Sequence, residues 1–308
     1  MNILEVRDLK KVFNKKEVVK GVTFTVRKGE IFGFLGKNGA GKTTTINMLT
    51  GISNPSSGEF ILCGKKSDQI EMIKKYIGVM PDASNFYNNV SAIDHLKFFL
   101  GLKKLNLSTN EMYNLLGKVG LEGAEKKKVE EFSFGMKKKL SIAQAMLGKP
   151  DIIFLDEPTS GLDPESALEI QQLMKEIQRE GITIFLTSHN LKEVEELCST
   201  IAIMKDGIVS KIGTIEQLRK ESNKGKEIFV KVRELFAKEI DELKKLFAPF
   251  TKNIEFTERD IVLEVDYNMD TSFIVKILSE KKIDIYELKE KKVSLEDIFF
   301  EDTIIRAI

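Results

Sequence analysis

Short apolar runs alternate with amphipathic stretches through the first two thirds of the sequence. Strand-like runs at residues 30–36, 151–156 and 182–188 are each followed by a turn and then by apolar residues at helical spacing. These helical patterns begin near Thr43, at Pro164 and at Leu191. Repeated strand and helix predict an α/β fold whose largely parallel sheet is covered on both faces.

Two other patterns interrupt this alternation. Residues 3–13, 18–30 and 58–66 alternate apolar and polar positions around glycine turns, as antiparallel strands do. They predict a small β layer packed beside the main sheet. Between about residues 85 and 149 strand signals stop and apolar residues recur at helical spacing, which predicts an inserted helical subdomain.

The chain becomes polar at residues 219–229, and the pattern after it changes. It reads as a strand at Glu227–Val232, a helix, two strands, a helix, a strand and a short helix. We therefore expect two domains, residues 1–220 and a small α+β accessory domain at residues 221–308.

Composition narrows the class of protein. The 48 lysines and arginines nearly balance the 47 acidic residues, so no strongly basic field attracts nucleic acid or anionic lipid. No apolar run approaches the roughly 18 to 20 residues that span a bilayer, and the start does not resemble a signal peptide. Cys63 and Cys198 lack metal-ligand spacing and are expected to be free thiols in a reducing cytoplasm.

The segment "GKNGAGKT" matches the phosphate-binding pattern G-x-x-x-x-G-K-[ST] and lies between a predicted strand and a predicted helix. Its glycines allow backbone N–H groups to surround a triphosphate, Lys42 reaches the β and γ phosphates, and the Thr43 hydroxyl is a candidate Mg²⁺ ligand. The residues predicted to bind ATP in this segment are Asn38, Gly39, Gly41, Lys42, Thr43 and Thr44.

Two adjacent carboxylates, Asp156 and Glu157, end the strand in "DIIFLDEPTSGLDP". The carboxyl ends of parallel strands meet at one edge of a sheet, so these groups are expected beside the phosphate loop. Asp156 is then a candidate ligand of Mg²⁺ through water. Glu157 is the candidate base that orients and deprotonates the attacking water.

Further motifs follow these segments in a fixed order along the chain. Together they make residues 1 to about 220 resemble the nucleotide-binding subunit of an ATP-binding cassette (ABC) ATPase. The family's signature looks like "FSFGM", with Ser133 and Gly135 at the informative positions, and "SGLDP" looks like its D-loop. The resemblance implies a head-to-tail dimer in which Ser133 and Gly135 cover the partner's ATP and Asp163 contacts the partner. Asp163 is also a good helix N-cap, with Pro164 at the first helical position.

The same resemblance assigns three further residues. His189, at the end of a predicted strand, matches the switch histidine that contacts the γ-phosphate and would join Lys42 and Glu157 in catalysis. Phe13 matches the aromatic residue that stacks on adenine. Asp82 stands where the family usually has glutamine, which leaves an oxygen for Mg²⁺ or water on a shorter arm.

The signature segment has one residue that departs from the family's pattern and is followed by an unusual run of lysines. Phe134 replaces a small or polar residue of the family's signature. Lys137, Lys138 and Lys139 oppose the dipole of the predicted signature helix, which suits either an anion bound there at times or a solvated helix face.

The resemblance implies a Mg²⁺-dependent ATP hydrolase that energises separate membrane permease subunits, expected at the cytoplasmic face of the cell membrane. The C-terminal domain is similar to that of an exporter-type subgroup, which makes an exporter the expected system. Two alternatives stay open: a soluble ABC ATPase that acts on nucleic acid or ribosomes, and a module that binds nucleotide without hydrolysing it. Balanced charge and the lack of coiled-coil heptads argue against the first, and Glu157 with His189 against the second.

Overall fold

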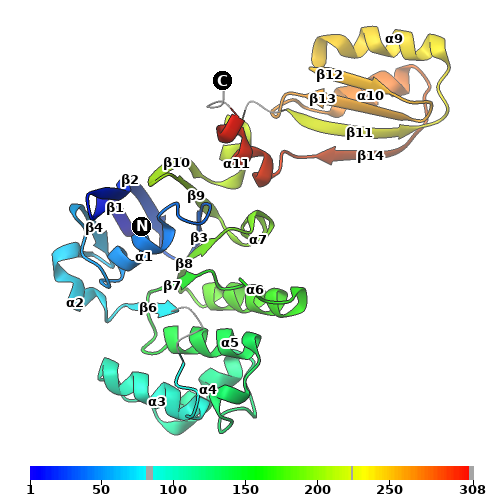
Figure 1. Cartoon of the computed structure of the whole chain (residues 1–308). Helices are drawn as coiled ribbons and strands as arrows, with labels where there is room; N and C mark the ends of the chain where they lie inside the picture. Colours follow the sequence, from blue (N-terminus) through cyan, green and yellow to red (C-terminus); the bar gives the residue numbers. More distant parts are fainter. Residues whose placement is uncertain (81–85, 223–224, 305–308) are drawn as a thin grey trace. The chain divides into compact units, whose positions relative to one another are not determined.

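The computed structural model describes residues 1–80, 86–222 and 225–304. The chain divides into two compact units, Met1–Gly213 and Thr214–Ile308. Figure 1 shows the chain and the labels of its helices and strands. The division lies seven residues before the domain boundary expected from the sequence.

A six-stranded sheet forms the centre of the first unit, with the order β10-β9-β3-β8-β7-β6. The inner strands pair in parallel, and only β10 runs antiparallel to its neighbour β9. Strand β3 is buried along its whole length, as a strand covered on both faces must be. The strands are β3 (Ile31–Leu35), β6 (Ile77–Met80), β7 (Ile152–Asp156), β8 (Thr183–Ser188), β9 (Thr200–Lys205) and β10 (Ile208–Gly213).

A second, antiparallel sheet has the order β2-β1-β4-β5. It contains β1 (Asn2–Phe13), β2 (Lys16–Arg27), β4 (Ser57–Leu62) and β5 (Lys65–Lys66). Helix α1 (Lys42–Leu49) contacts both β2 and β7, and short α2 (Ile70–Ile73) contacts β5. Helices α6 (Pro164–Arg179) and α7 (Leu191–Leu197) lie against the other face of the main sheet (Figure 1).

Three helices gather beyond edge strand β6 (Figure 1). They are α3 (Ala92–Lys103), α4 (Thr109–Lys118) and α5 (Phe134–Ala145), and α5 packs on β6. Serine side chains accept hydrogen bonds at the N-termini of all three, from Asp94, Glu111 and Met136 backbone N–H groups. These helices form the helical insertion within the first unit.

Phenylalanine rings join the two sheets of the first unit. Phe185 of β8 lies with its ring centroid 5.3 to 6.0 Å from those of Phe24 (β2), Phe32 and Phe34 (β3) and Phe154 (β7). All five side chains are buried. Aromatic contacts at such distances add to the free energy gained by burial alone. These buried rings therefore form a closely packed core between the two sheets.

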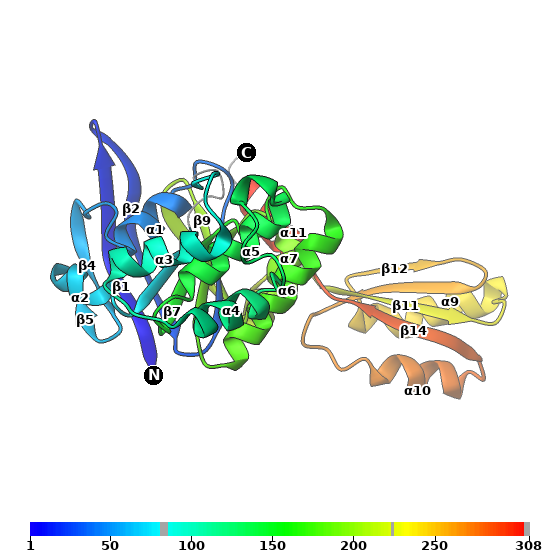
Figure 2. The ribbon, with the colours of Figure 1, turned by 90° about the horizontal axis from the view of Figure 1, so that it is seen from below.

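The second unit has one four-stranded antiparallel sheet, in the order β12-β13-β11-β14. Helix residues Leu243, Phe247, Ile274 and Leu278 share a core with alternate strand residues, so both long helices cover one face of this sheet. Figure 2 shows the unit from another side. Its elements are α8 (Ile215–Glu221), β11 (Lys226–Val232), α9 (Ala237–Phe247), β12 (Asn253–Phe256), β13 (Asp260–Val265), α10 (Ser272–Glu280), β14 (Ile285–Lys291) and α11 (Leu295–Ile304).

The predicted α/β class with an antiparallel layer, a helical insertion and a small α+β unit is confirmed. Both cysteines are free thiols, as expected, and burial raises the pKa of Cys63 to about 12. Over residues 1–80, 86–222 and 225–304, no helix is both long and apolar enough to cross a membrane.

Phe185→Ala is expected to lower the free energy of unfolding of the first unit by about 3–5 kcal/mol, because it empties the centre of the phenylalanine cluster. Urea denaturation followed by circular dichroism measures this change. Leu168→Ala, at a side chain that is 61% exposed on α6, is the control and should change it by less than about 0.5 kcal/mol. A loss below about 1 kcal/mol for Phe185→Ala would contradict the role of this cluster.

Candidate functional site

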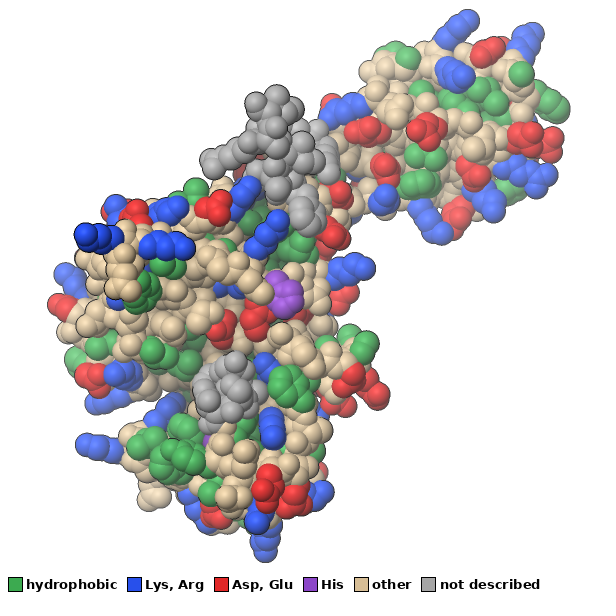
Figure 3. Space-filling view, viewed as in Figure 1, with side chains coloured by type: hydrophobic (Ala, Val, Ile, Leu, Met, Phe, Trp, Pro, Cys, Tyr) green, Lys and Arg blue, Asp and Glu red, His purple; other side chains and the backbone are tan. Residues whose placement is uncertain are grey.

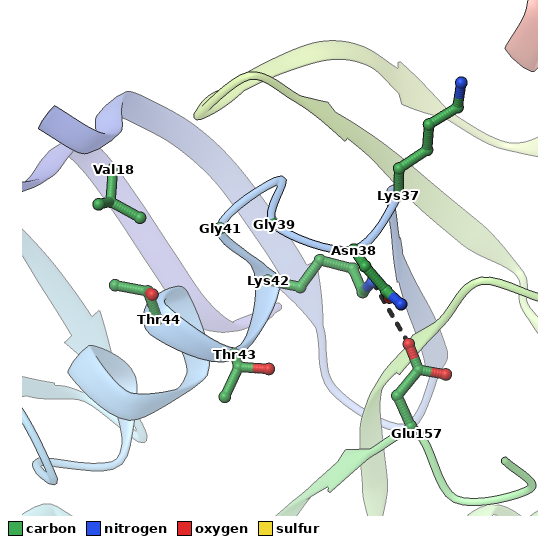
Figure 4. A pocket seen from close by; sticks show the side chains of 9 residues that line it. All are labelled: Val18, Lys37, Asn38, Gly39, Gly41, Lys42, Thr43, Thr44 and Glu157. Carbon is green, nitrogen blue, oxygen red and sulfur yellow. Dashed lines mark ion pairs between the residues drawn. The ribbon is translucent and has the colours of Figure 1, made fainter.

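The phosphate-loop segment, residues 36–43, joins β3 to α1 and surrounds a cavity of about 290 Å³ (Figure 4). Gly41 has a φ of 111°, and a Cβ atom there would lie 2.6 Å from Met204 Cε. Only glycine therefore fits this turn without strain. The cavity is lined by Val18, Lys37, Asn38, Gly39, Gly41, Lys42, Thr43, Thr44 and Glu157.

Lys42 is a buried cation at this cavity. Its Nζ donates a hydrogen bond to the Gly36 carbonyl oxygen at 2.7 Å and lies 3.3 Å from Glu157 Oε1 (Figure 4). A buried ammonium group needs an anionic or carbonyl partner, and a phosphate oxygen satisfies the same requirement. The structure thus brings Lys42, from the loop, against Glu157, from the end of β7.

Asp156 is held between two hydroxyl groups. Thr43 Oγ1 donates to Asp156 Oδ2 at 3.0 Å, and Thr187 Oγ1 donates to Asp156 Oδ1. A threonine hydroxyl beside one carboxylate is a donor set that suits Mg²⁺, which commonly keeps waters and takes its other ligands from substrate phosphates. Among the described residues there is no group of three or more His, Cys, Asp or Glu that would hold a metal without substrate.

The Glu157 carboxylate lies between a lysine and a histidine. His189 Nδ1 is 2.8 Å from Glu157 Oε2, on the side opposite to Lys42's contact with Oε1. The Glu157 N–H group donates to Thr187 Oγ1 at 3.1 Å. Glu157 and His189 follow neighbouring parallel strands, β7 and β8, which explains why residues 32 positions apart in sequence meet here.

The signature and D-loop residues lie at helix N-termini. Ser133 caps α5, and its Oγ accepts from Met136 N–H at 3.2 Å. Asp163 caps α6 with Pro164 at the first helical position, as predicted, and accepts from Ser166 N–H at 3.0 Å. The backbone hydrogen bond from Ser166 is the main cause that lowers the pKa of Asp163. Ser133, Asp163 and Gly135 do not line the phosphate-loop cavity.

Phe13 and Asp82 are the two remaining predicted site residues. Phe13 ends β1, is 46% exposed and has Lys11 Nζ 4.8 Å from its ring centroid, but it does not line the cavity. Val18 of β2 lines it instead. Asp82 lies outside the described residues.

Three residues that sequence analysis did not assign to the site help to build it. Thr187 binds both Asp156 and the Glu157 backbone. Lys138 is buried rather than part of a solvated helix face, and its Nζ donates to the Glu157 carbonyl oxygen at 2.9 Å. The polar run "TSH" at the end of a buried strand was a signal for Thr187, whereas nothing in the run of three lysines distinguishes Lys138.

Glu193 of α7 is the third of these residues. Its buried carboxylate accepts hydrogen bonds from Thr159 Oγ1 at 2.7 Å and from Ser188 Oγ at 3.1 Å. Thr159 follows the Asp156–Glu157 pair, and Ser188 precedes His189, so Glu193 connects the two segments. Burial raises the pKa of Glu193 above its ordinary value of 4.5.

Comparisons with known proteins agree with this geometry. Residues 19–160 match the family model described as ABC transporter. The chain is 34% identical to "Uncharacterized ABC transporter ATP-binding protein YcbN" of Bacillus subtilis, over 97% of this chain and 96% of that protein. It is 37% identical to "Bacitracin transport ATP-binding protein BcrA" of Bacillus licheniformis, over 72% of this chain and 73% of that one.

A solved structure titled "Structure of ATP binding subunit of ABC transporter" is also similar. It superposes with a TM-score of 0.64 and 31% identity, covering 71% of this chain and 92% of its own. The fold, the phosphate loop and these relatives together define an ABC-type ATPase. The chain belongs to the ABC transporter family, as an ATP-binding subunit.

The raised pKa of Glu193 should make the free energy of unfolding depend on pH. Because its folded-state pKa is raised, the native protein holds this proton more tightly than the unfolded chain, and the stability gained is largest below pH 4.5. That gain is lost as the pH rises through the raised value. The unfolding free energy of wild type minus that of Glu193→Gln should therefore fall as the pH increases from about 4.5.

Urea denaturation of both proteins at a series of pH values measures this difference. Glu196→Gln, at an exposed position of the same helix, controls for the loss of one negative charge. A difference between wild type and Glu193→Gln that rises with pH would contradict the assignment.

Proposed function

We propose that this chain hydrolyses Mg²⁺-bound ATP at the phosphate loop and thereby drives separate membrane subunits of an exporter. The observation that carries the proposal is the Glu157 carboxylate, held between Lys42 and His189 at the wall of the phosphate-loop cavity. A structural ion pair needs no cavity beside it. A base for hydrolysis needs one, because its water and substrate must fit there.

The phosphate loop binds ATP in this account. Its N–H groups and the N-terminus of α1 surround the phosphates, and Lys42 exchanges Glu157 for phosphate oxygens. This exchange frees one carboxylate oxygen of Glu157 to accept a hydrogen bond from water. Lys42 thus offsets the charge of Glu157 before ATP binds and stabilises the phosphates afterwards.

Thr43 and Asp156 are the proposed Mg²⁺-holding residues, with Asp156 acting through water. Their oxygens already lie 3.0 Å apart, and Thr187 fixes the far carboxylate oxygen. When bound, Mg²⁺ neutralises charge on the phosphate oxygens. Asp82 stays a proposed further oxygen ligand on the basis of sequence.

Glu157 and His189 divide the work on the attacking water. Glu157 orients the water and accepts its proton, which is typically worth about 10² to 10⁴ in rate. His189 Nδ1 holds the second carboxylate oxygen, and its exposed ring is available to the γ-phosphate. The contact with His189 keeps the Glu157 carboxylate in one orientation while Lys42 binds the phosphates of ATP.

A second ATPase subunit, identical or related, completes the site. Ser133 and Gly135 at the start of α5, with Asp163 at the start of α6, are proposed to contact the partner and its ATP, because helix N-termini attract phosphate. Phe13 is proposed to stack on adenine at the outer end of β1.

The membrane partner is proposed to bind the helical insertion. Tyr87, Phe98 and Leu102 are 57%, 45% and 63% exposed, and the rings of Tyr87 and Phe98 meet edge to face at 5.2 Å between centroids. Figure 3 shows hydrophobic side chains gathered over α3. Exposed apolar patches of this kind mark protein contacts. A permease bound here would hold the ATPase at the cytoplasmic face of the membrane.

The direction of transport and the role of the second unit are also proposals. The relative named for bacitracin transport supports a transport role. Export is proposed from the similarity of the second unit to an exporter-type subgroup, and the membrane subunits would select the cargo. Residues 221–308 are proposed to be an accessory domain that supports the ATPase or its dimer. The alternative of a soluble ATPase acting on nucleic acid is not favoured, since the relatives are transporter subunits.

Glu157→Gln should retain ATP binding but lower kcat for hydrolysis by at least about 100-fold, because the amide cannot accept the proton of water. Phosphate release and binding of a fluorescent ATP analogue measure the two properties. Glu176→Gln, at an exposed position of α6, should hydrolyse ATP at the wild-type rate. Hydrolysis by Glu157→Gln within threefold of wild type would refute the proposed role.

Tyr87→Ser with Phe98→Ser should abolish recovery of a multi-span membrane protein when ATP-loaded Glu157→Gln protein is used as bait on detergent-solubilised native membranes. The loss is expected because both exposed rings are removed from the patch. Tyr286→Ser, at a 67% exposed tyrosine of the second unit, is the control and should leave recovery unchanged. Equal recovery by the double variant would place the permease contact elsewhere.

A further inference from the structure

Lys138 is a buried lysine whose ammonium group reaches the backbone of the proposed base. Its side chain is only 3% exposed, and its Nζ donates to the Glu157 carbonyl oxygen at 2.9 Å. Burying an ammonium group is costly unless hydrogen bonds compensate for lost water. An apolar side chain would fill the same space at less cost. The cation therefore suggests a role beyond packing.

Glu157 has a backbone conformation that needs support. Its φ of 50° lies in the left-handed region, which costs a residue with a side chain on the order of 1 kcal/mol or more. The Glu157 N–H group is held by Thr187, and its carbonyl oxygen accepts from Lys138 and from Ser160 N–H. Main-chain bonds on both sides thus fix the direction in which the Glu157 side chain leaves the strand.

The same ammonium group lies close to two other segments. Lys138 Nζ is 5.5 Å from the centroid of the Phe134 ring, within the range of a cation–π contact. Phe134 in turn packs against Gly161, whose φ is 79° and where a Cβ atom would lie 3.1 Å from the ring. Lys138 therefore joins the start of α5 to the end of β7 and to the turn before α6.

Helix α5 also carries Ser133 at its N-cap, five residues before Lys138. Under the proposed function, Ser133 meets the ATP held by the partner, while Glu157 serves the ATP of its own subunit. A small movement of α5 would be transmitted by Lys138 to the Glu157 main chain. The lysine thereby offers a physical connection between the two ATP sites of a dimer.

We propose that Lys138 is a positioning residue for ATP hydrolysis: it holds the Glu157 main chain so that the carboxylate faces the attacking water, and it makes this alignment depend on α5. This inference rests on the proposed role of Glu157. It differs from a purely structural role because it predicts that Lys138 acts only through Glu157.

Lys138→Met tests the proposal, since it keeps an unbranched side chain and removes the donor. The kcat for ATP hydrolysis should fall by about tenfold or more, because general-base assistance worth about 10² to 10⁴ is then partly lost, while KM for ATP stays within about twofold. Lys138→Arg keeps a donor and a charge and should recover most of the rate. Lys139→Met is the matched control, since Lys139 on the same helix pairs with Glu169 at 2.8 Å, and should change neither constant.

A double-mutant cycle distinguishes positioning from general structural damage. If Lys138 acts through Glu157, single-turnover hydrolysis by Lys138→Met with Glu157→Gln should equal that of Glu157→Gln alone. Independent effects that multiply would overturn the inference. A wild-type rate in Glu157→Gln alone would instead refute the proposed function, so the two failures are distinguishable.

A second variant covers the case in which Lys138→Met does not fold. Lys138→Leu also removes the donor and is a good helix former, and thermal unfolding reports whether each variant is folded. A folded Lys138→Leu with lowered kcat and unchanged KM supports the inference. A folded Lys138→Leu or Lys138→Met with a wild-type kcat overturns it.

Discussion

Parallel pairing of β3, β8 and β7 is the constraint on which the candidate ATP site depends. The register places Leu35 beside Ser188 and Asp156 beside Thr187, so the chain leaves all three strands at one edge. Segments that are more than 100 residues apart in sequence therefore supply the phosphate loop and the carboxylates. The phenylalanine cluster beneath this edge keeps the three strand ends in a fixed relation. A site built on strand ends of this kind is precise because the scaffold is rigid.

Charge balance follows from this arrangement. Lys42 would be an uncompensated buried cation without Glu157, and Glu157 would lack a second restraint without His189. In the proposed mechanism a phosphate group would replace Glu157 as the partner of Lys42, while His189 keeps its contact with the carboxylate. The strained Glu157 main chain is stabilised from β8 by Thr187 and from α5 by Lys138. In the proposed mechanism, ATP binding and hydrolysis would therefore use one set of contacts.

Much of this could be predicted from sequence because the signals are local. The phosphate loop, the strand-end carboxylates and the Asp163 cap with Pro164 each occupy a short segment, and the strands beside them are strongly apolar. Lys138 was not predictable, since a lysine within a run of three has no local sign of burial and only the packing of α5 against β7 decides it. The edge strand β6 was not predicted either, because four residues are too few to show the alternation of a strand. Contacts that arise from tertiary packing could not be predicted from the sequence, whereas those encoded by a turn or a helix cap could.

The most direct test of the central claim is an experimental structure of the Glu157→Gln protein with ATP and Mg²⁺. The account predicts that Lys42 Nζ leaves residue 157 for the phosphates, that Thr43 and Asp156 face the metal, and that a water lies between the residue 157 side chain and the γ-phosphate. A structure in which Lys42 stays on residue 157, or in which that side chain points away from the γ-phosphate, would contradict it.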